Sequence, residues 1–355
     1  YGYCGTTGHE SDITWNLTGT SPNYTLNISG TGAMVDYASD NVRPWDSNRS
    51  NIKSVVVGDG VTHIGNLAFR YCEQTALTIG NDVKSIGNYA FHNCGSLTTV
   101  EIPNSVETIG ASAFKYLSNL TTVTIGNGLK SIGDEGFNYC VKLSTITLNS
   151  NPKIGSGAFS ASPVTVTMNL TANSDGGNYW MTFFNDGYNF PADDNTTVYK
   201  GTLSGSSVSL TEVTDKIVTA GTAVILKSTG NPVMTLNSEA SSDTNSNSLQ
   251  GVSDVNGLQS DGTIYVLNKG TSGVGFYKLK SGKTLGYGKA YLSSTSAPSY
   301  LNFEEDETTS LSEELRVKNE EFATAQWYTL EGRKLIGKPS TKGMYIVNGK
   351  KVIIK

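Results

Sequence analysis

The sequence has 355 residues, a formal net charge of −5 and only 16% charged residues. This length accommodates about two or three domains, and the slight acidic excess argues against a nucleic-acid partner. No apolar run approaches about 18 residues, so we expect no membrane span. The chain starts at Tyr1 without a methionine, from which we expect that a signal peptide has been removed. Low charge with abundant Ser, Thr, Asn and Gly favours an extracellular location.

Residues 1–51 are predicted to form an N-terminal β cap. Residues 12–17 and 24–34 alternate polar and apolar side chains, as the strands of a hairpin do. We interpret Trp15 and Trp45 as aromatic side chains that cover the core, with sugar-stacking platforms as the alternative. We expect Cys4 to pack against the first coil, with a disulfide as its alternative.

Residues 52–170 repeat one phrase, Ile-Gly-x-x-Ala-Phe, in which the fourth copy has Gly136 in place of Ala. The spacing between copies is 22 or 23 residues, which predicts a solenoid whose units bury their apolar sides against their neighbours. In this phrase we expect Ile and Phe to fill the interior, Gly to permit a tight bend and Ala to let coils approach closely. The copies begin at Ile64, Ile86, Ile109, Ile132 and Ile154.

Short alternating runs between the phrases, such as Val100/Ile102 and Val123/Ile125, predict one strand per repeat. Their stacking gives a parallel sheet with a Val/Ile/Leu core on one face and a mostly Thr-lined face toward solvent. That outer face is the candidate ligand-binding site, although Thr is also simply a good exposed strand residue. The candidate residues are Thr78, Thr99, Glu101, Thr122, Thr124, Thr145 and Thr147.

These repeats resemble a known family. Residues 97–114 read Leu-Thr-Thr-Val-Glu-Ile-Pro-Asn-Ser-Val-Glu-Thr-Ile-Gly-Ala-Ser-Ala-Phe, which is similar to the BspA-like, or Treponema-type, leucine-rich repeats of bacterial surface proteins. The common leucine-rich signature has an Asn or Cys ladder after the strand, and we expect none here. The resemblance implies a solenoid at the cell surface that adheres to host or neighbouring-cell components.

Cys72, Cys94 and Cys140 each lie three residues after the Phe of the phrase, and Leu117 takes that place in the third repeat. A position shared by Cys and Leu indicates a buried apolar site. We therefore predict buried free thiols, with an inter-rung disulfide or a metal site as the alternatives. Because no C-x-x-C spacing or partner His accompanies them, we expect no metal and no cofactor.

Residues 171–303 contain several strand-like runs separated by Gly, Asn, Asp or Ser clusters, with no helical period. They predict an antiparallel all-β sandwich or barrel. The segment resembles a β domain that recurs in secreted proteins of Bacteroidota, and that resemblance implies no activity.

Residues 304–321, which open with Glu304-Glu305-Asp306-Glu307, are predicted to be an acidic, polar linker; a calcium site is the alternative. In residues 322–355, Asn348-Gly349 between two apolar runs predicts a β-hairpin. This end resembles the C-terminal sorting-type modules of exported Bacteroidota proteins, which implies export and attachment to the cell surface.

Little in the sequence indicates catalysis. The histidines are His9, His63 and His92, and the repeat places the last two at variable surface positions. A Ser–His–carboxylate constellation would need one of them near a nucleophile. The pair Asp193-Asp194 with Glu101 lies in two different domains, so a glycosidase site is not expected.

The sequence therefore predicts a non-catalytic, adhesin-like surface protein, without a nucleic-acid partner and monomeric. Its ligand would be a host or neighbouring-cell surface protein or glycan, bound by the outer sheet face. The alternative is a carbohydrate-binding protein that uses Trp180 and Tyr179 of the 171–303 domain. A third hypothesis is an enzyme of unrecognised type.

Overall fold

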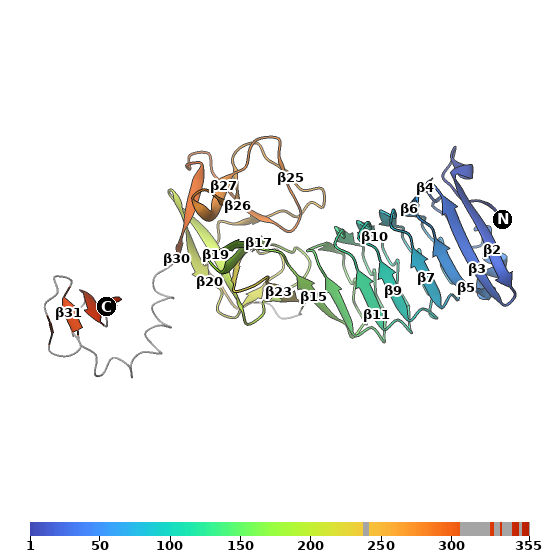
Figure 1. The fold of residues 1–355 in the computed structure, drawn as a ribbon, viewed down its shortest axis with the longest axis horizontal. Helices are drawn as coiled ribbons and strands as arrows, with labels where there is room; N and C mark the ends of the chain where they lie inside the picture. Colours follow the sequence, from blue (N-terminus) through green and yellow to red (C-terminus); the bar gives the residue numbers. More distant parts are fainter. Residues whose placement is uncertain (237–240, 306–326, 330–333, 336–342, 348–349, 355) are drawn as a thin grey trace. The chain divides into compact units, whose positions relative to one another are not determined.

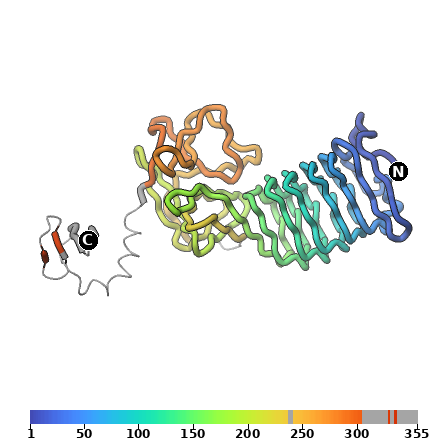
Figure 2. The backbone as a smooth tube through the Cα atoms, in the orientation of Figure 1, coloured from blue at the N-terminus to red at the C-terminus, as the bar shows by residue number. Residues whose placement is uncertain are grey.

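The computed structural model describes residues 1–236, 241–305, 327–329, 334–335, 343–347 and 350–354. The chain divides into two compact units, Tyr1–Phe303 and Glu304–Lys355. The first unit holds the cap, the solenoid and a β domain, and its successive coils can be followed in Figure 2.

The N-terminal cap covers the open end of the solenoid. Its strand β3 is antiparallel to β2 and parallel to β5, so the cap sheet runs directly into the repeat sheet. The indole of Trp45 is fully buried and stacks on Phe69, with ring centroids 5.8 Å apart. Trp15 meets Trp45 edge-on, which confirms core-covering aromatics. The cap elements are β1 (Gly2–Tyr3), η1 (Glu10–Asp12), β2 (Ile13–Thr20), β3 (Asn23–Gly30) and η2 (Asp46–Asn51).

One parallel strand per repeat forms the first face of the solenoid, as predicted (Figure 1). Val100, Val123 and Ile146 occupy equivalent places on consecutive strands and are buried, while the residues on either side of each are exposed. The strands are β5 (Ile52–Val57), β7 (Ala76–Ile79), β9 (Thr99–Ile102), β11 (Thr122–Ile125), β13 (Thr145–Leu148) and β15 (Thr165–Asn169).

A second parallel sheet, which the sequence analysis missed, closes the opposite side of each coil. Its strands are mostly two residues long, so they are too short to show an alternation. All of them end at the Ile of the repeated phrase except the first, which lies in the cap and ends at Ala33. They are β4 (Gly32–Ala33), β6 (Val61–Ile64), β8 (Ser85–Ile86), β10 (Thr108–Ile109), β12 (Ser131–Ile132) and β14 (Lys153–Ile154).

The glycine of the repeated phrase has a different role from the predicted tight bend. A Cβ on Gly87 would lie 2.5 Å from the backbone nitrogen of Asn66, and one on Gly110 would lie 2.6 Å from that of Asn88. Glycine is therefore required because each coil crosses the previous one closely. The turn itself uses a left-handed residue two places later, as at Tyr89, where φ is 57°.

A column of stacked phenylalanines fills the coil interior. Phe91 stacks on Phe114 with ring centroids 5.2 Å apart, and Phe114 stacks on Phe137 at 5.1 Å. The cysteines beside this column are buried thiols, as predicted. They are not purely apolar, because the Sγ–H of Cys140 donates to the carbonyl oxygen of Phe114 at 3.2 Å.

A side-chain ladder does follow the first-face strands, contrary to the expectation that none would be present. The Oδ1 atom of Asn104 accepts the backbone N–H of Asn127 at 2.9 Å, one coil further on. The Oδ1 atom of Asp59 accepts that of Asn81 at 2.7 Å. These contacts satisfy turn N–H groups that have no partner within their own coil.

The β domain is an antiparallel-rich half-barrel, which confirms an all-β domain. Its strand β23 (Val233–Thr235) pairs antiparallel with β15 and so closes the C-terminal edge of the solenoid sheet. The solenoid core continues into this domain through Met181, Phe183 and Met234.

The large sheet of the β domain has the order β16 (Asn173–Asp175), β17 (Asn178–Phe183), β22 (Val224–Ser228), β19 (Thr196–Ser204), β20 (Ser207–Glu212), β30 (Tyr300–Glu305), β27 (Gly273–Lys278), β26 (Ile264–Gly270), β29 (Ala290–Ser293) and β24 (Gln250–Gly251). The two small ribbons pair β18 (Phe190–Pro191) with β21 (Ile217–Val218), and β25 (Leu258–Gln259) with β28 (Thr284–Leu285).

The second unit contains a three-stranded antiparallel sheet of β31 (Trp327–Thr329), β32 (Gly343–Val347) and β33 (Lys350–Ile354). Val347 pairs with Lys350, so the chain reverses where the hairpin is predicted. Asn348, Gly349 and most of the predicted linker lie outside the described residues. Within the described ranges, no helix has the length and apolar character that crossing a membrane requires.

Candidate functional site

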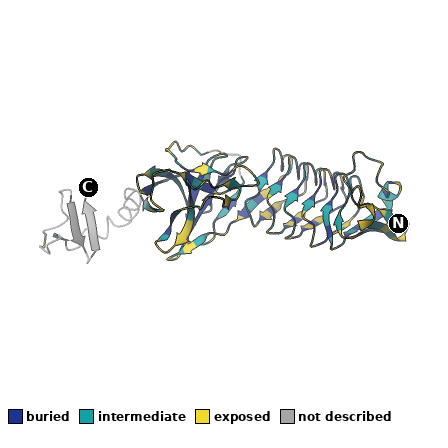
Figure 3. Ribbon diagram, turned by 90° about the horizontal axis from the view of Figure 1, so that it is seen from above, coloured by how far each residue is buried: buried dark blue, intermediate teal, exposed yellow. Residues whose placement is uncertain are grey.

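All seven predicted binding residues are exposed and stand on first-face strands of the solenoid. Figure 3 shows exposed and buried stretches along the solenoid. Strand register aligns Glu101, Thr124 and Thr147 in one row. It aligns Thr99, Thr122 and Thr145 in a second row. Thr78 precedes Glu101 by one repeat on the neighbouring strand β7. The structure thus brings these side chains together, and their role in binding stays a prediction.

A groove of about 550 Å³ runs along the carboxyl ends of these strands. Three predicted residues, Thr78, Glu101 and Thr124, line it, whereas the other four lie on the sheet outside it. The rest of the polar lining was not predicted from the sequence. The signal was an Asn one or two residues after four successive strands, namely Asn81, Asn104, Asn127 and Asn149.

The groove is suited to hydrogen bonding with an extended ligand. Glu101 is the single ionisable residue among those that line the groove, so the groove carries a negative charge. The threonine hydroxyl groups and asparagine amides around it can each donate and accept hydrogen bonds. Because the strands behind them are held by a packed core, these groups keep a fixed spacing.

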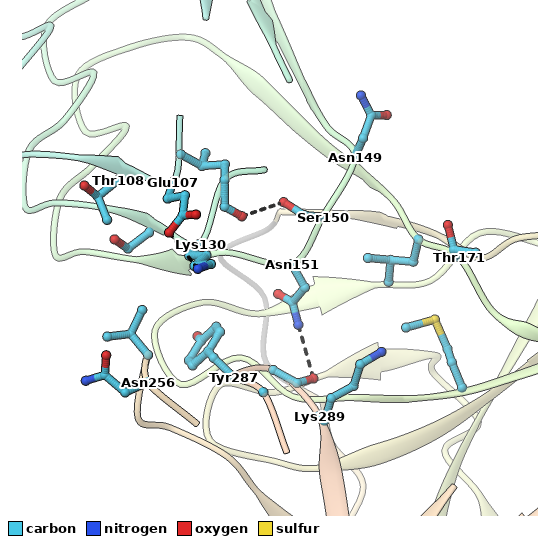
Figure 4. A pocket seen from close by; sticks show the side chains of 17 residues that line it. Glu107, Thr108, Lys130, Asn149, Ser150, Asn151, Thr171, Asn256, Tyr287 and Lys289 are labelled. Carbon is cyan, nitrogen blue, oxygen red and sulfur yellow. Dashed lines mark hydrogen bonds and ion pairs between the residues drawn. The ribbon is translucent and has the colours of Figure 1, made fainter. Parts of the chain in front are cut away.

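A second cleft, of about 700 Å³, lies where the solenoid meets the β domain (Figure 4). One wall comes from solenoid turns and the other from residues 255–256 and 286–289. Asn151 joins the walls, since its Nδ2 donates to the carbonyl oxygens of Phe184 at 2.9 Å and Gly288 at 3.3 Å. Asn149 borders both this junction cleft and the sheet-face groove.

Two lysines that line the junction cleft differ in their partners. Lys130 Nζ lies 2.6 Å from Oε2 of Glu107, so these two charges compensate one another. Lys289 has neither an ion pair nor a side-chain hydrogen bond within the part of the chain that the structure describes. Its side chain is exposed to the solvent of the cleft, and desolvation by the neighbouring walls lowers the pKa of Lys289.

The prediction that His92 lies at the surface is wrong. Its side chain is only 8% exposed, and its ring packs between Tyr71, Tyr89 and Tyr116. Burial and the nearby positive charges of Arg70 and Lys115 lower the pKa of His92 to about 4. The imidazole is therefore neutral at pH 7.

His63, by contrast, does lie between a serine and a carboxylate. Its Nδ1 is 2.6 Å from Oγ of Ser85, and its Nε2 is 3.0 Å from Oδ1 of Asp36. The same Asp36 oxygen accepts the backbone N–H of Asn66 at 2.7 Å. The three side chains tie the cap to successive coils, and neither the groove nor the junction cleft is lined by them. No pattern in the sequence indicates this contact, because Asp36 lies in the irregular cap.

The β-domain residues considered above for binding or catalysis line neither the groove nor the junction cleft. Trp180 is 7% exposed and stacks on Phe303 with centroids 4.8 Å apart, so it cannot serve as an open sugar platform. Tyr179, next to it, is half-buried. Asp193 accepts a hydrogen bond from Thr196 within the β domain. Neither cleft is lined by Asp193 or Asp194, so no carboxylate pair forms with Glu101 in them.

Comparison with protein families decides the class of the repeats. Residues 47–165 match the BspA type leucine rich repeat region in six copies. The solenoid is a BspA-type repeat region. The match starts before the first Ile-Gly phrase, and it counts one copy more than the five phrases of the sequence. The predicted BspA-like repeats are thus confirmed for this part of the chain.

Several solved structures are similar to the chain at low identity. A leucine-rich repeat protein from Eubacterium ventriosum is 22% identical, with a TM-score of 0.26, over 43% of this chain and 62% of its own. The T. pallidum leucine-rich repeat protein is 22% identical, with a TM-score of 0.27, over 43% and 87%. A leucine-rich cell surface protein from Faecalibacterium prausnitzii is 22% identical, with a TM-score of 0.30, over 56% and 59%. This chain therefore spans less than two thirds of the first and third of these proteins. No curated protein matches it.

Proposed function

We propose that this protein is an exported, non-catalytic recognition protein that binds a protein or glycan through the first face of its BspA-type solenoid. The proposal rests on two exposed rows of side chains, which consist of threonines and Glu101. Beside these rows runs a groove lined by asparagines. Repeat solenoids commonly use such continuous faces for extended ligands.

The physical advantage of this face is its fixed geometry. Strands β11 and β13, which carry Thr122, Thr124, Thr145 and Thr147, are paired with both neighbours, and β7 and β9 are each paired on one side. Buried Val or Ile side chains back all four strands. A ligand therefore does not have to order the surface when it binds, which reduces the entropic cost of association. The carboxylate of Glu101 favours a ligand with a positive or hydroxyl-rich group at that point of the groove.

The location and the partner belong to the same proposal. The low charge of the sequence and the resemblance of residues 322–355 to Bacteroidota sorting-type modules support export and attachment to the cell surface. The partner would be a protein or glycan of a host or a neighbouring cell, bound by a monomer. Protease treatment of intact cells, followed by detection of the chain, tests the location, and light scattering of the purified protein tests the monomeric state.

The binding proposal is tested by screening the full chain against arrays of glycans and extracellular-matrix proteins. For any ligand found, Thr124→Lys and Thr147→Lys place a long cation on the face and should weaken binding at least about tenfold. Glu101→Gln tests the charge of the groove. Ser118→Lys is the matched control, because it adds the same charge on an exposed turn outside the groove.

Two results would contradict the proposal. One is a ligand whose affinity is the same for the wild type and all three face variants. The other is an absence of ligands in both arrays while the folded state is intact by circular dichroism.

A further inference from the structure

The junction cleft has the chemistry of a separate small-ligand site. Its volume of about 700 Å³ lies within the usual range for ligand pockets, about 300–1,000 Å³. The side chains of Asn149, Asn256 and Thr171 line it and make no hydrogen bond with any described residue of the chain. They remain available to hydroxyl or amide groups of a ligand, which both donate and accept.

The charge balance of the cleft leaves one positive group. Glu107 and Lys130 neutralise each other at 2.6 Å. The hydroxyl group of Tyr287 donates to Oδ1 of Asp186 at 2.9 Å, so this phenol is also committed. Lys289 alone among the charged lining residues has no partner in the described ranges. A ligand that matches this cleft therefore carries a single negative charge rather than the several charges of a polyphosphate.

The walls of the cleft also offer apolar area. Tyr287 lies between Asn256 and Lys289 in Figure 4, and its hydrogen bond to Asp186 holds the ring in the wall. Leu170 and Met181 line the same cleft. An aromatic ring with a fixed orientation, free amides and one ammonium group together suit a ligand with an apolar ring face, many hydroxyl groups and one anionic group.

We propose that the junction cleft binds an acidic saccharide, a sugar unit that carries one carboxylate or one sulfate group. Lys289 pairs with the anionic group, Asn256 and Thr171 bind hydroxyl or acetamido groups, and the ring of Tyr287 packs against the sugar. This site is distinct from the sheet-face groove, because the two share only Asn149 among their lining residues.

Isothermal titration calorimetry of the full chain tests this site with three probes. Sialyllactose and lactose share their neutral part and differ by one carboxylate-bearing sugar, and lactose 3′-sulfate supplies one sulfate on the same neutral disaccharide. We expect at least one acidic probe to bind at least about tenfold more tightly than lactose, with an affinity that falls as salt rises. Lys289→Gln should remove this preference. Lys283→Gln is the control, because Lys283 is exposed and outside the cleft.

Asn256→Ala provides a second variant that leaves the charge unchanged, and we expect it to weaken the acidic probe several-fold. The proposal is overturned if neither acidic probe binds the wild type in the millimolar range, or if lactose binds equally well. It is also overturned if Lys289→Gln binds the acidic probes like the wild type. Thr124→Lys should leave saccharide binding at the cleft unchanged, so failure of the sheet-face proposal is distinguishable from failure of this one.

Discussion

The thiol of Cys94 donates a hydrogen bond to the carbonyl oxygen of Phe69, 3.0 Å away and one coil earlier in the solenoid. Cys140 makes the same bond to Phe114, and in the last repeat Ser162 Oγ makes it to Phe137 at 2.8 Å. In three of the five coils, the residue three places after the Phe thus donates a hydrogen bond to the preceding coil, and Ser can replace Cys there.

Substitution of Cys94 tests this link. Cys94→Ala removes both the donor and the sulfur volume and should lower the free energy of unfolding by about 1–2 kcal/mol, measured by urea denaturation. Cys94→Ser keeps a donor and should lose less. Cys4→Ala is the control, because Cys4 is buried but its thiol has no hydrogen bond among the described residues. Equal losses for the Ser and Ala variants of Cys94 would show that the hydrogen bond is unimportant.

The four thiols should be unreactive in the native state. Burial raises the pKa of Cys4, Cys72 and Cys140 to about 12, and it raises that of Cys94 well above its ordinary value. Because the thiolate is the reactive form, we expect negligible reaction with a disulfide reagent at pH 8. All four should react rapidly in denaturant. Fewer than four reactive thiols after unfolding would indicate a disulfide and contradict the structure.

The close crossing of coils makes Gly110 sensitive to a single methyl group. In Gly110→Ala the new Cβ would lie 2.6 Å from the backbone nitrogen of Asn88, which cannot move without separating two coils. We expect a loss of about 1–3 kcal/mol in the free energy of unfolding. Gly95→Ala is the matched control, since its Cβ would meet only the side-chain oxygen of Ser118, at 3.3 Å. A similar stability for both variants would contradict this account.

Protonation of His92 should destabilise the fold in acid. Its pKa is about 4 in the folded state, as burial, Arg70 and Lys115 outweigh the opposite effect of Asp40, against about 6.5 in the unfolded chain. The unfolded state therefore binds the proton more readily, and the contribution of His92 is complete above about pH 6.5 and is lost as pH falls toward 4. We expect a loss of up to about 3 kcal/mol.

The contribution of His92 is isolated by comparison with His92→Asn, which places at this position the residue found at Asn138 in a later coil. Urea denaturation of both proteins between pH 7 and pH 4 gives the difference in their stabilities. That difference should become smaller, or reverse, as pH falls. A difference that is constant with pH would show that His92 does not titrate in this range.

The sequence was sufficient for the features that recur in every coil. The period places the first-face strands, and the alternation around Val100 and Val123 distinguishes the buried side from the exposed side. It was insufficient for features that depend on neighbouring coils. Lys115 occupies the place of His92 one repeat later, so the position looks exposed, and only the tyrosines of adjacent coils bury it.

The clefts illustrate the same limit. The groove was partly predicted, because Thr78, Glu101 and Thr124 come from the strand alternation, whereas Asn104 and Asn127 lie in turns where no periodic signal was sought. The junction cleft could not be predicted at all. It unites Lys130 and Lys289, which are far apart in the sequence and meet only because the β domain packs on the last coils.

Antiparallel strands terminate the repeat array at both ends, β2–β3 at the N-terminal end and β23 at the C-terminal end. Because neither end depends on the number of repeats between them, the length of the array can change without altering its ends. Duplication of one whole internal repeat would leave both ends intact and lengthen the exposed face by one strand spacing, about 4.8 Å. A deletion would shorten it by the same step. The number of repeats thus sets the length of the exposed face. The affinity of a ligand that contacts several strands would change with each added or removed repeat.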